Sequence, residues 1–383
     1  MANKADSTET EGKAKKKVDK SKMSFTERAL HIGGLIDSTP VKVPRLSTGS
    51  MLLDDYLDGG FPRGDVSELW GGNNTGKTST ALIAASQPDV STAWFNVEGQ
   101  TTLKEWALRL GVDLSRFIEL QFNTAEQYAE MIVEAIRSKS FDYVVVDSVA
   151  MMASKAELEL DLQDKSITQM GMSAKLFTLL MRLMGSAMVG NTRTHVILIN
   201  QLRSGLGQYV PDNSPGGNAL HHKPCFRLKF KRLDEDWEDG DEKMNLRQIG
   251  IKLAMTKSKA ATFKGGDLIF PVTFLPNGDV RVDTIDECFT LAERYGLFRN
   301  AKGDVWGGTG NCTYLGEVLG NGRTAARLGL RSSPVTFEAL YQEVTDIING
   351  TRQPATDRPA VDNPAEEPEF DGEFAAEREV ERF

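Results

Sequence analysis

Hydrophobic and polar positions divide the chain into short, continuous apolar runs and longer segments with apolar residues at helical spacing. The short runs are typical of strands buried on both faces, and the longer segments are typical of amphipathic helices. Strands are predicted at Val66 to Trp70, Thr92 to Val97, Phe117 to Phe122, Tyr143 to Val146 and His195 to Ile199. Helices are predicted at Lys77 to Ser86, Thr102 to Leu110, Ala125 to Ser138 and roughly Ser173 to Val189. This alternation indicates an α/β fold with a mainly parallel sheet covered on both faces.

The later strands follow one another without long helices between them, so we expect them to extend the same sheet in antiparallel fashion. They are predicted at Phe226 to Leu233, Gln248 to Ala254 and Leu268 to Phe274. Beyond Val282, predicted helices at Ile285 to Tyr295 and Phe337 to Ile348 flank glycine-rich loops. This last part indicates a small, separate C-terminal α+β unit.

Charge is distributed unevenly along the 383 residues, whose net charge is −9. Residues 357–383 contain ten acidic residues and three arginines, whereas residues 13–22 contain six lysines and one aspartate. Both ends have the composition of disordered segments. The acidic end could compete with a nucleic acid for a basic surface, or both ends could only keep the protein soluble, and composition does not decide between the two.

Cysteine content and hydropathy exclude two classes of protein. Cys225, Cys288 and Cys312 lie far apart without metal-ligand spacing, and the four histidines form no zinc pattern, so we expect reduced thiols that pack in the interior. No apolar run approaches the roughly 20 residues needed to cross a bilayer, and the lysine-rich start does not resemble a signal peptide. A soluble, cytoplasmic protein with no membrane partner is expected.

A glycine-rich segment between a predicted strand and a predicted helix fits the P-loop pattern G-x-x-x-x-G-K-S/T in full. Its glycines let backbone N–H groups converge on phosphates, and the start of the following helix adds positive potential. The Lys77 ammonium is expected to bind the β and γ phosphates of ATP, and the Thr78 hydroxyl to hold Mg²⁺. The expected nucleotide contacts in this segment are Gly71, Gly72, Asn73, Asn74, Thr75, Gly76, Lys77, Thr78 and Ser79.

Two acidic residues follow predicted strands of the same sheet. Asp147 ends the apolar run Tyr143 to Val146, and Glu98 ends the run Thr92 to Val97. Because parallel strands have their carboxyl ends at one edge, we expect both acids near the P-loop. Asp147 would then bind the Mg²⁺ shell, and Glu98 could orient the water that attacks the γ-phosphate. Position alone is equally compatible with a solvent-facing Glu98.

These motifs, taken in order, resemble the RecA-type homologous recombinases of the bacterial and bacteriophage branch, from about Pro44 to about Trp306. The resemblance implies a RecA-like P-loop ATPase core with ATP and Mg²⁺ as cofactors. It also implies DNA-dependent ATP hydrolysis, filament formation on single-stranded DNA and strand exchange in DNA repair. The matching segments are Ser47 to Ser50, Gly59-Gly60-x-Pro62-x-Gly64, the P-loop, Glu98, Asp147 to Ala150, Lys155 to Glu157, Asn200-Gln201-x-Arg203, Gly216 to Leu220 and Lys257-x-Lys259.

The resemblance implies roles for residues around the nucleotide. Glu98 matches the catalytic glutamate, Gln201 matches the residue that senses the γ-phosphate, and Trp106 matches an aromatic residue that stacks on adenine. Lys257 and Lys259 match lysines that reach the ATP phosphates of the adjacent subunit. Without the resemblance, the two lysines would be an ordinary solvated strand end.

Two segments resemble the DNA-binding loops of the family, Leu158 to Gly171 and Leu202 to Pro215. Apolar residues in such loops can enter between bases, while cations and backbone N–H groups bind phosphates. An ordinary surface loop is the alternative for each segment. The residues expected to contact DNA are Met170, Lys175, Arg182, Arg203, Tyr209, Val210, Gly216, Gly217 and Asn218.

The resemblance also implies a domain organisation and partners. The expected partners are single-stranded and double-stranded DNA and further copies of the chain in a helical filament, and single-strand-binding and mediator proteins are further candidates. The expected segments are a disordered basic N-terminus (1–23), a subunit-docking segment (24–45), the ATPase core (46–282), the C-terminal domain (283–350) and a disordered acidic tail (351–383).

Two other functions are compatible with a P-loop core. A hexameric helicase or another motor is the first, and the paired DNA-type loops and the lysine pair argue against it. A regulator that uses ATP only as a switch is the second, and the complete set of Lys77, Asp147 and Glu98 argues against it.

Overall fold

The computed structural model describes residues 24, 27, 42–155, 172–202, 217–231, 233, 238–239, 247–262 and 266–354. Contacts divide the chain into two units, Met1–Val43 and Pro44–Phe383, and nearly all described residues belong to the second. Most of the expected docking segment and both expected tails therefore lie outside the described residues, as does the greater part of the two DNA-type loops.

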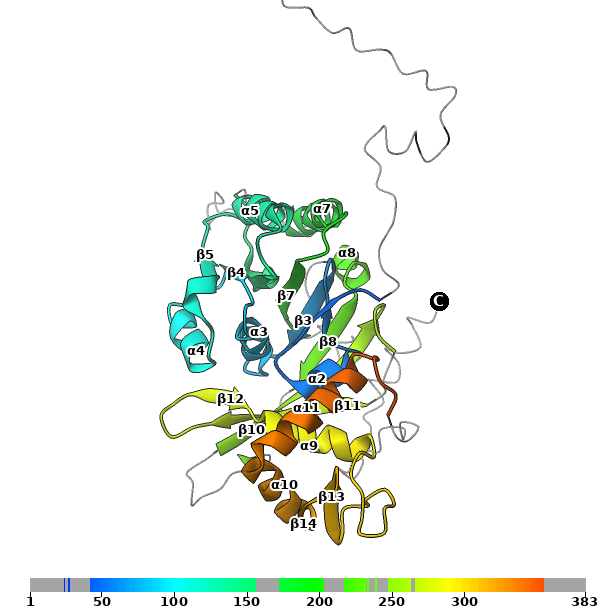
Figure 1. Ribbon diagram of the computed structural model, residues 1–383. Helices are drawn as coiled ribbons and strands as arrows, with labels where there is room; N and C mark the ends of the chain where they lie inside the picture. The colour runs from blue at the N-terminus through cyan, green and yellow to red at the C-terminus, as the bar shows by residue number, and fades with distance from the viewer. Residues whose placement is uncertain are drawn as a thin grey trace, which may run out of the picture. The chain divides into compact units, whose positions relative to one another are not determined.

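In the described part of the chain, ten strands form one sheet in the order β12-β11-β10-β8-β3-β7-β6-β4-β5, with β9 paired to β10 (Figure 1). A short pair, β1 (Arg45–Leu46) and β2 (Phe61–Pro62), lies apart from it. The ten strands are β3 (Val66–Gly71), β4 (Thr92–Asn96), β5 (Phe117–Leu120), β6 (Tyr143–Asp147), β7 (His195–Gln201), β8 (Phe226–Lys231), β9 (Glu238–Asp239), β10 (Arg247–Ser258), β11 (Asp267–Phe274) and β12 (Val280–Val282).

Strand direction confirms the mixed sheet, with one correction. β10 pairs antiparallel with β8 and with β11, as expected. β8, which was expected to be antiparallel, instead runs parallel to β3. The reason is the connection from β7, which returns to the amino edge of the sheet before β8 begins and is long enough for a crossover.

Helices cover both faces of the parallel half, and the strand side chains alternate between two hydrophobic clusters. In β6, Tyr143 and Val145 belong to one cluster, and Val144 and Val146 belong to the other. This alternation explains why β6 reads as an unbroken apolar run. The covering helices are α3 (Lys77–Ala85) and α4 (Leu103–Arg109) on one face, and α5 (Ala125–Ser138), α7 (Met172–Ala187) and α8 (Gly217–His222) on the other.

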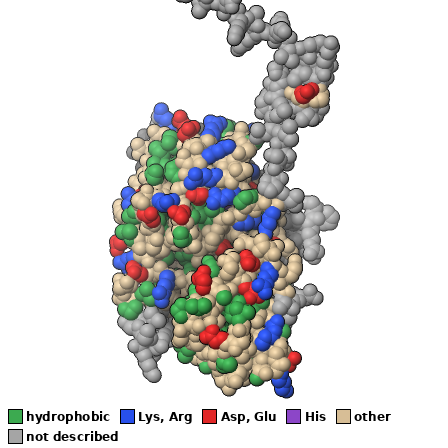
Figure 2. Space-filling view, viewed as in Figure 1, with side chains coloured by type: hydrophobic (Ala, Val, Ile, Leu, Met, Phe, Trp, Pro, Cys, Tyr) green, Lys and Arg blue, Asp and Glu red, His purple; other side chains and the backbone are tan. Residues whose placement is uncertain are grey.

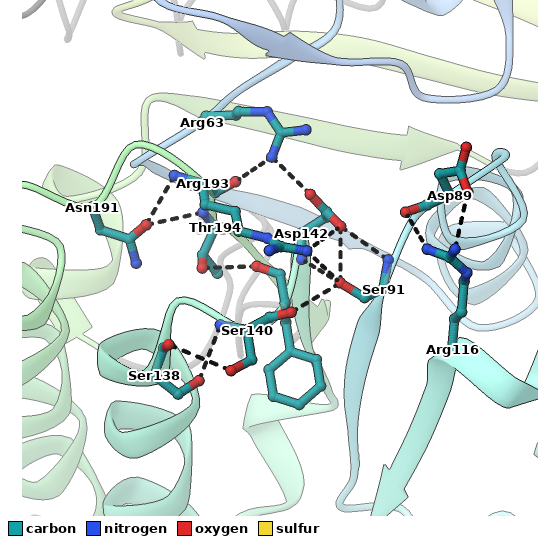
Figure 3. Close-up of polar contacts among 11 residues, drawn as sticks. Arg63, Asp89, Ser91, Arg116, Ser138, Ser140, Asp142, Asn191, Arg193 and Thr194 are labelled. Atoms are coloured by element: carbon teal, nitrogen blue, oxygen red, sulfur yellow. Dashed lines mark hydrogen bonds and ion pairs between the residues drawn. The ribbon is translucent and has the colours of Figure 1, made fainter.

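At the amino edge of the sheet, the Asp142 carboxylate joins several segments through hydrogen bonds. Asp142, at the start of β6, accepts hydrogen bonds from Arg63 Nη1 at 2.8 Å, Ser91 Oγ at 2.8 Å and Arg193 Nη2 at 3.3 Å (Figure 3). Burial alone would raise the pKa of Asp142, but these donors outweigh it and hold the pKa below its usual value. The clamp fixes the starts of β4, β6 and β7 at the edge opposite the P-loop.

The last part of the described chain packs into the same hydrophobic cluster as the sheet. Glu287 joins the two, because its carboxylate accepts hydrogen bonds from Ser50 Oγ and from the Met51 N–H, both at 2.7 Å, at the start of α2 (Met51–Tyr56). The elements of this part are α9 (Thr284–Arg294), β13 (Asn311–Tyr314), β14 (Glu317–Asn321), α10 (Arg323–Ser332) and α11 (Pro334–Ile348).

Stability should depend on pH through Glu287. Burial raises its pKa to about 8, above the value of 4.5 for an exposed glutamate, despite the donors from Ser50 and Met51. A folded pKa above the unfolded one means that stability is lost as the pH rises between these two values. We expect wild type to lose free energy of unfolding relative to Glu287→Gln over this window, by up to about 1.4 kcal/mol per pH unit. Urea unfolding at several pH values measures the difference, and parallel curves for the two proteins would contradict the prediction.

Candidate nucleotide-binding site

A cavity of about 470 Å³ lies at the carboxyl ends of the parallel strands, where β3 leads into α3. It brings together the P-loop from Asn73 to Ser79 and four of the other residues expected at the nucleotide, which are Glu98, Trp106, Asp147 and Gln201. Gln100 and Ile199 complete its lining and were not expected from the sequence. The parallel strands thus bring residues that are far apart in the chain together in one site.

The P-loop needs glycine at both ends of its turn. Gly71 has a φ of +152°, and a Cβ there would lie 2.3 Å from the carbonyl oxygen of Phe230. Gly76 is left-handed with a φ of +93°, and its Cβ would lie 3.0 Å from Ile251. Close approach to the β8 backbone therefore requires glycine at position 71, and the left-handed conformation beside the Ile251 side chain favours it at position 76. Thr75 Oγ1 donates to the Gly72 carbonyl at 2.9 Å and closes the turn.

Lys77 lies beneath this turn and is almost completely buried. Its ammonium donates to the carbonyl oxygens of Gly71 at 3.1 Å and Gly72 at 2.5 Å. Burial lowers the pKa of Lys77, and the nearby carboxylates of Asp147 and Glu98 oppose that shift. A cation is therefore held directly below the backbone that would contact phosphates.

Thr78 and Asp147 meet on one side of the cavity. Thr78 Oγ1 donates to Asp147 Oδ2 at 2.9 Å. Burial raises the pKa of Asp147 to about 6, and the charge of Glu98 adds to the shift, while Thr78 and Lys77 oppose it. A hydroxyl beside a carboxylate is a set of oxygen donors that fits Mg²⁺.

Glu98 lies opposite, between two glutamine side chains. Gln201 Nε2 donates to Glu98 Oε1 at 2.9 Å, and Gln100 Nε2 donates to Oε2 at 2.8 Å. Burial would raise the pKa of Glu98, but polar contacts with Ser148, Gln100 and Gln201 outweigh it, so the pKa lies below its usual value. Glu98 is therefore still charged at the pH at which Asp147 begins to accept a proton.

Trp106 forms a wall of the cavity from α4. Its indole Nε1 donates to Ser79 Oγ at 3.3 Å, and its ring centroid lies 6.4 Å from that of Phe274 on β11. These contacts fix the ring beside the start of α3, where a flat apolar surface is available to a base.

The other expected residues that the structure describes do not line the cavity. Lys257 and Lys259 donate from the end of β10 to the carbonyl oxygens of His221 and His222, the last residues of α8. Lys175 and Arg182 are exposed on α7, and the surface over α5 and α7 carries several basic side chains (Figure 2). Met170, Arg203, Tyr209, Val210 and Gly216 lie outside the described residues, and Gly217 and Asn218 are described only as the first residues of α8.

The two basic residues of α7 share one hollow, of about 410 Å³, with Thr178 and Leu179. Leu179 is half exposed between them. The spacing of seven residues places both cations on one face of the helix, as expected. The face combines charge with an apolar side chain.

A strand, a glycine turn around a buried lysine, a helix and a strand-end aspartate with its threonine define a P-loop ATPase. The protein-family model of the RecA N-terminal domain matches residues 13–270 of this chain. The chain is 31% identical to Protein RecA of Chlorobium limicola over 322 residues, which cover 82% of this chain and 86% of that protein. It is 31% identical to Protein RecA of Arthrospira platensis over 352 residues, which cover 90% of each chain.

The chain therefore belongs to the RecA family, and the resemblance in its motifs is confirmed. It is a RecA-type recombinase, a DNA-dependent ATPase of recombination and repair. Within the residues that the structure describes, no helix combines the length and the apolar character needed to cross a membrane.

Nucleotide binding should weaken in acid through Asp147. A pKa of about 6 means that the carboxyl group is increasingly protonated below that pH and loses its affinity for Mg²⁺. We expect the affinity of wild type for Mg²⁺-ATP to fall below about pH 6, by up to about tenfold per pH unit, beyond any fall in Asp147→Asn. Calorimetric titration of both proteins across this range removes the protonation of the nucleotide itself from the comparison. Equal pH profiles would contradict the role of Asp147.

Proposed function

We propose that ATP and Mg²⁺ in this cavity control how firmly the chain binds single-stranded DNA, and that the resulting filament performs homologous pairing and strand exchange. The hydrogen bond between Gln201 and Glu98 is the main support. Gln201 is the last residue of β7, and the DNA-type segment Leu202 to Pro215 follows it directly in the sequence. A side chain that touches the catalytic glutamate thus lies at the start of the proposed DNA loop.

The residues of the cavity divide the work of hydrolysis. Lys77 would exchange its carbonyl partners for the β and γ phosphates, and Thr78 and Asp147 would hold Mg²⁺. The ion held there would supply positive charge against the charge that develops on the phosphates. Glu98, charged and oriented by its two glutamines, would accept a hydrogen bond from the attacking water. Trp106 would stack on adenine.

Lys257 and Lys259 are proposed to complete the site of an adjacent subunit. Neither lines the cavity of its own chain. Each donates to a carbonyl oxygen at the end of α8, and another copy could bring its phosphates to this part of the chain. An interface between two different surfaces builds a helical filament when its rotation does not close into a ring.

DNA is proposed to contact the exposed face of α7 and the two DNA-type segments, Leu158 to Gly171 and Leu202 to Pro215. Lys175 and Arg182 would bind successive phosphates, and Leu179 supplies an apolar contact between them. α7 follows the segment that contains Met170, and α8 follows the segment that contains Tyr209 and Val210. Double-stranded DNA enters as the second substrate of strand exchange.

Single-stranded DNA should stimulate ATP hydrolysis, and two substitutions should abolish it in different ways. Lys77→Ala removes the buried cation and should prevent nucleotide binding. Glu98→Gln keeps the hydrogen-bonding shape, so it should bind ATP normally and lose about 10²-fold or more in kcat. Phosphate release and binding of a fluorescent ATP analogue measure the two effects. Glu105→Gln, on the exposed face of α4, is the matched control and should behave as wild type.

Two outcomes would count against this assignment. Normal turnover in Glu98→Gln would remove Glu98 from its role. ATP hydrolysis that does not respond to DNA would contradict the proposed function, and closed rings in negative stain would favour a motor.

Mixing two inactive variants tests whether the lysines act across subunits. Glu98→Gln lacks the glutamate, and the double variant Lys257→Ala with Lys259→Ala lacks the lysines. In an equal mixture, random assembly places an intact glutamate beside intact lysines at about a quarter of interfaces. We expect about a quarter of the wild-type ATPase rate to return, and no recovery at all if the lysines serve only their own chain. Lys252→Ala, from the same strand, controls for loss of charge.

A further inference from the structure

A buried row of polar side chains crosses the centre of the sheet between the cavity and the lysine pair. It spans β7, β3, β8 and β10, which are neighbours in the sheet (Figure 1). Glu68 lies at its centre on β3 and is directly opposite Arg227 of β8. Neither residue lines the cavity, so binding and hydrolysis of ATP there do not account for them.

The first half of the row starts at the sensor glutamine. The Gln201 N–H donates to Asn200 Oδ1 at 3.0 Å, and Asn200 Nδ2 donates to Glu68 Oε1 at 2.8 Å. Arg227 Nε then donates to the other oxygen, Glu68 Oε2, at 2.7 Å. Each oxygen of Glu68 therefore binds a different strand.

The second half runs from Arg227 to the lysines. Thr256 Oγ1 donates to the Arg227 carbonyl at 3.1 Å and accepts from Trp70 Nε1 at 3.4 Å. The Arg227 guanidinium lies 5.1 Å from the centroid of the Trp70 ring, which stabilises it from the side. Thr256 immediately precedes Lys257, whose ammonium donates to the His221 carbonyl at the end of α8. The row thus ends at the helix that follows the proposed DNA loop.

A charged pair at this depth is costly. Glu68 and Asn200 are fully buried, and Arg227 is 6% exposed. Central parallel strands are usually apolar, and an apolar pair of the same volume is often at least as stable as a buried ion pair. The pair is therefore poorly explained by stability alone. Its directional hydrogen bonds do provide a fixed register between strands, which apolar packing does not.

We propose that Glu68, Asn200 and Arg227 are positioning residues that link Gln201 to the Lys257–Lys259 pair. A shift of Gln201 toward a γ-phosphate would move Asn200, and the ion pair would pass that movement to β8 and β10. The state of the nucleotide in one subunit would thereby set where the lysines lie for the next subunit and how the end of α8 is held. This inference rests on the proposed function, because it assumes that Gln201 senses ATP.

The experiment measures coupling between nucleotide and DNA. The readout is the ratio of the affinity for a single-stranded oligonucleotide with a non-hydrolysable ATP analogue to the affinity with ADP. Glu68→Met combined with Arg227→Met replaces the pair as a unit and is expected to keep the fold. We expect its coupling ratio to fall about tenfold or more while the affinity for the ATP analogue itself stays within about twofold.

Two further variants make the test decisive. Asn200→Ala keeps both members of the ion pair and removes the hydrogen bonds that join the pair to Gln201, so it should lose coupling in the same way. It decides the matter if the double variant does not fold. Ser67→Ala is the matched control, because Ser67 is equally buried on β3, faces the opposite side of the sheet and bonds to His195 at 3.0 Å. It should keep the full ratio.

The outcomes distinguish failure of the proposed function from failure of the link between Gln201 and the lysine pair through Glu68, Asn200 and Arg227, which we call the relay. Wild type without any effect of ATP on DNA binding would overturn the proposed function and the relay with it. Coupling in wild type together with an unchanged ratio in a folded Glu68→Met/Arg227→Met protein, or in Asn200→Ala, would overturn the relay alone. Lost coupling at a retained affinity for the ATP analogue would support it, since general destabilisation would weaken nucleotide binding as well.

Discussion

The buried ammonium of Lys77 is the interaction on which the nucleotide site depends. It lies under the P-loop carbonyls and attracts two carboxylates that line the same cavity, Asp147 and Glu98. The surroundings move the two carboxylates apart in pKa. Burial raises the pKa of Asp147 to about 6, whereas three polar neighbours hold the pKa of Glu98 below its usual value. Near neutral pH both are charged, and their combined negative charge suits a site that must recruit a divalent cation.

The same cation explains why the glycines of the loop cannot be replaced. The backbone must approach β8 closely enough for Lys77 to reach two consecutive carbonyls. A side chain at Gly71 would push the loop away from β8 and uncover the ammonium. The glycine pattern and the buried charge are therefore one constraint, which links backbone conformation directly to phosphate chemistry.

Local patterns predicted most of the sheet and the heart of the cavity. The apolar runs located β3, β4, β6 and β7 closely, and the P-loop was complete in the sequence. Residues after strand ends met at one edge because parallel strands require it. Gln100 was missed because nothing in its neighbours distinguishes a loop glutamine that contacts Glu98 from one that faces solvent.

Pairings between distant residues could not be predicted in this way. Glu68 stood inside a predicted strand with no sign of its partner, Arg227, which is 159 residues away in the chain. The parallel direction of β8 and the contact of Glu287 with α2 are of the same kind, since each depends on where the chain returns. Single-residue patterns report on local geometry, whereas these contacts depend on strand order.

Two buried carboxylates of this chain lie where separate elements must keep a fixed relation. Glu287 joins α9 to α2, and Glu68 joins β7, the strand of Gln201, to β8. Each costs desolvation that an apolar residue would avoid. Hydrogen bonds have direction, so they define one arrangement where apolar contacts would tolerate sliding. An ATPase that passes a change at a phosphate to a distant surface, as we propose for this chain, needs that definition more than it needs the last increment of stability.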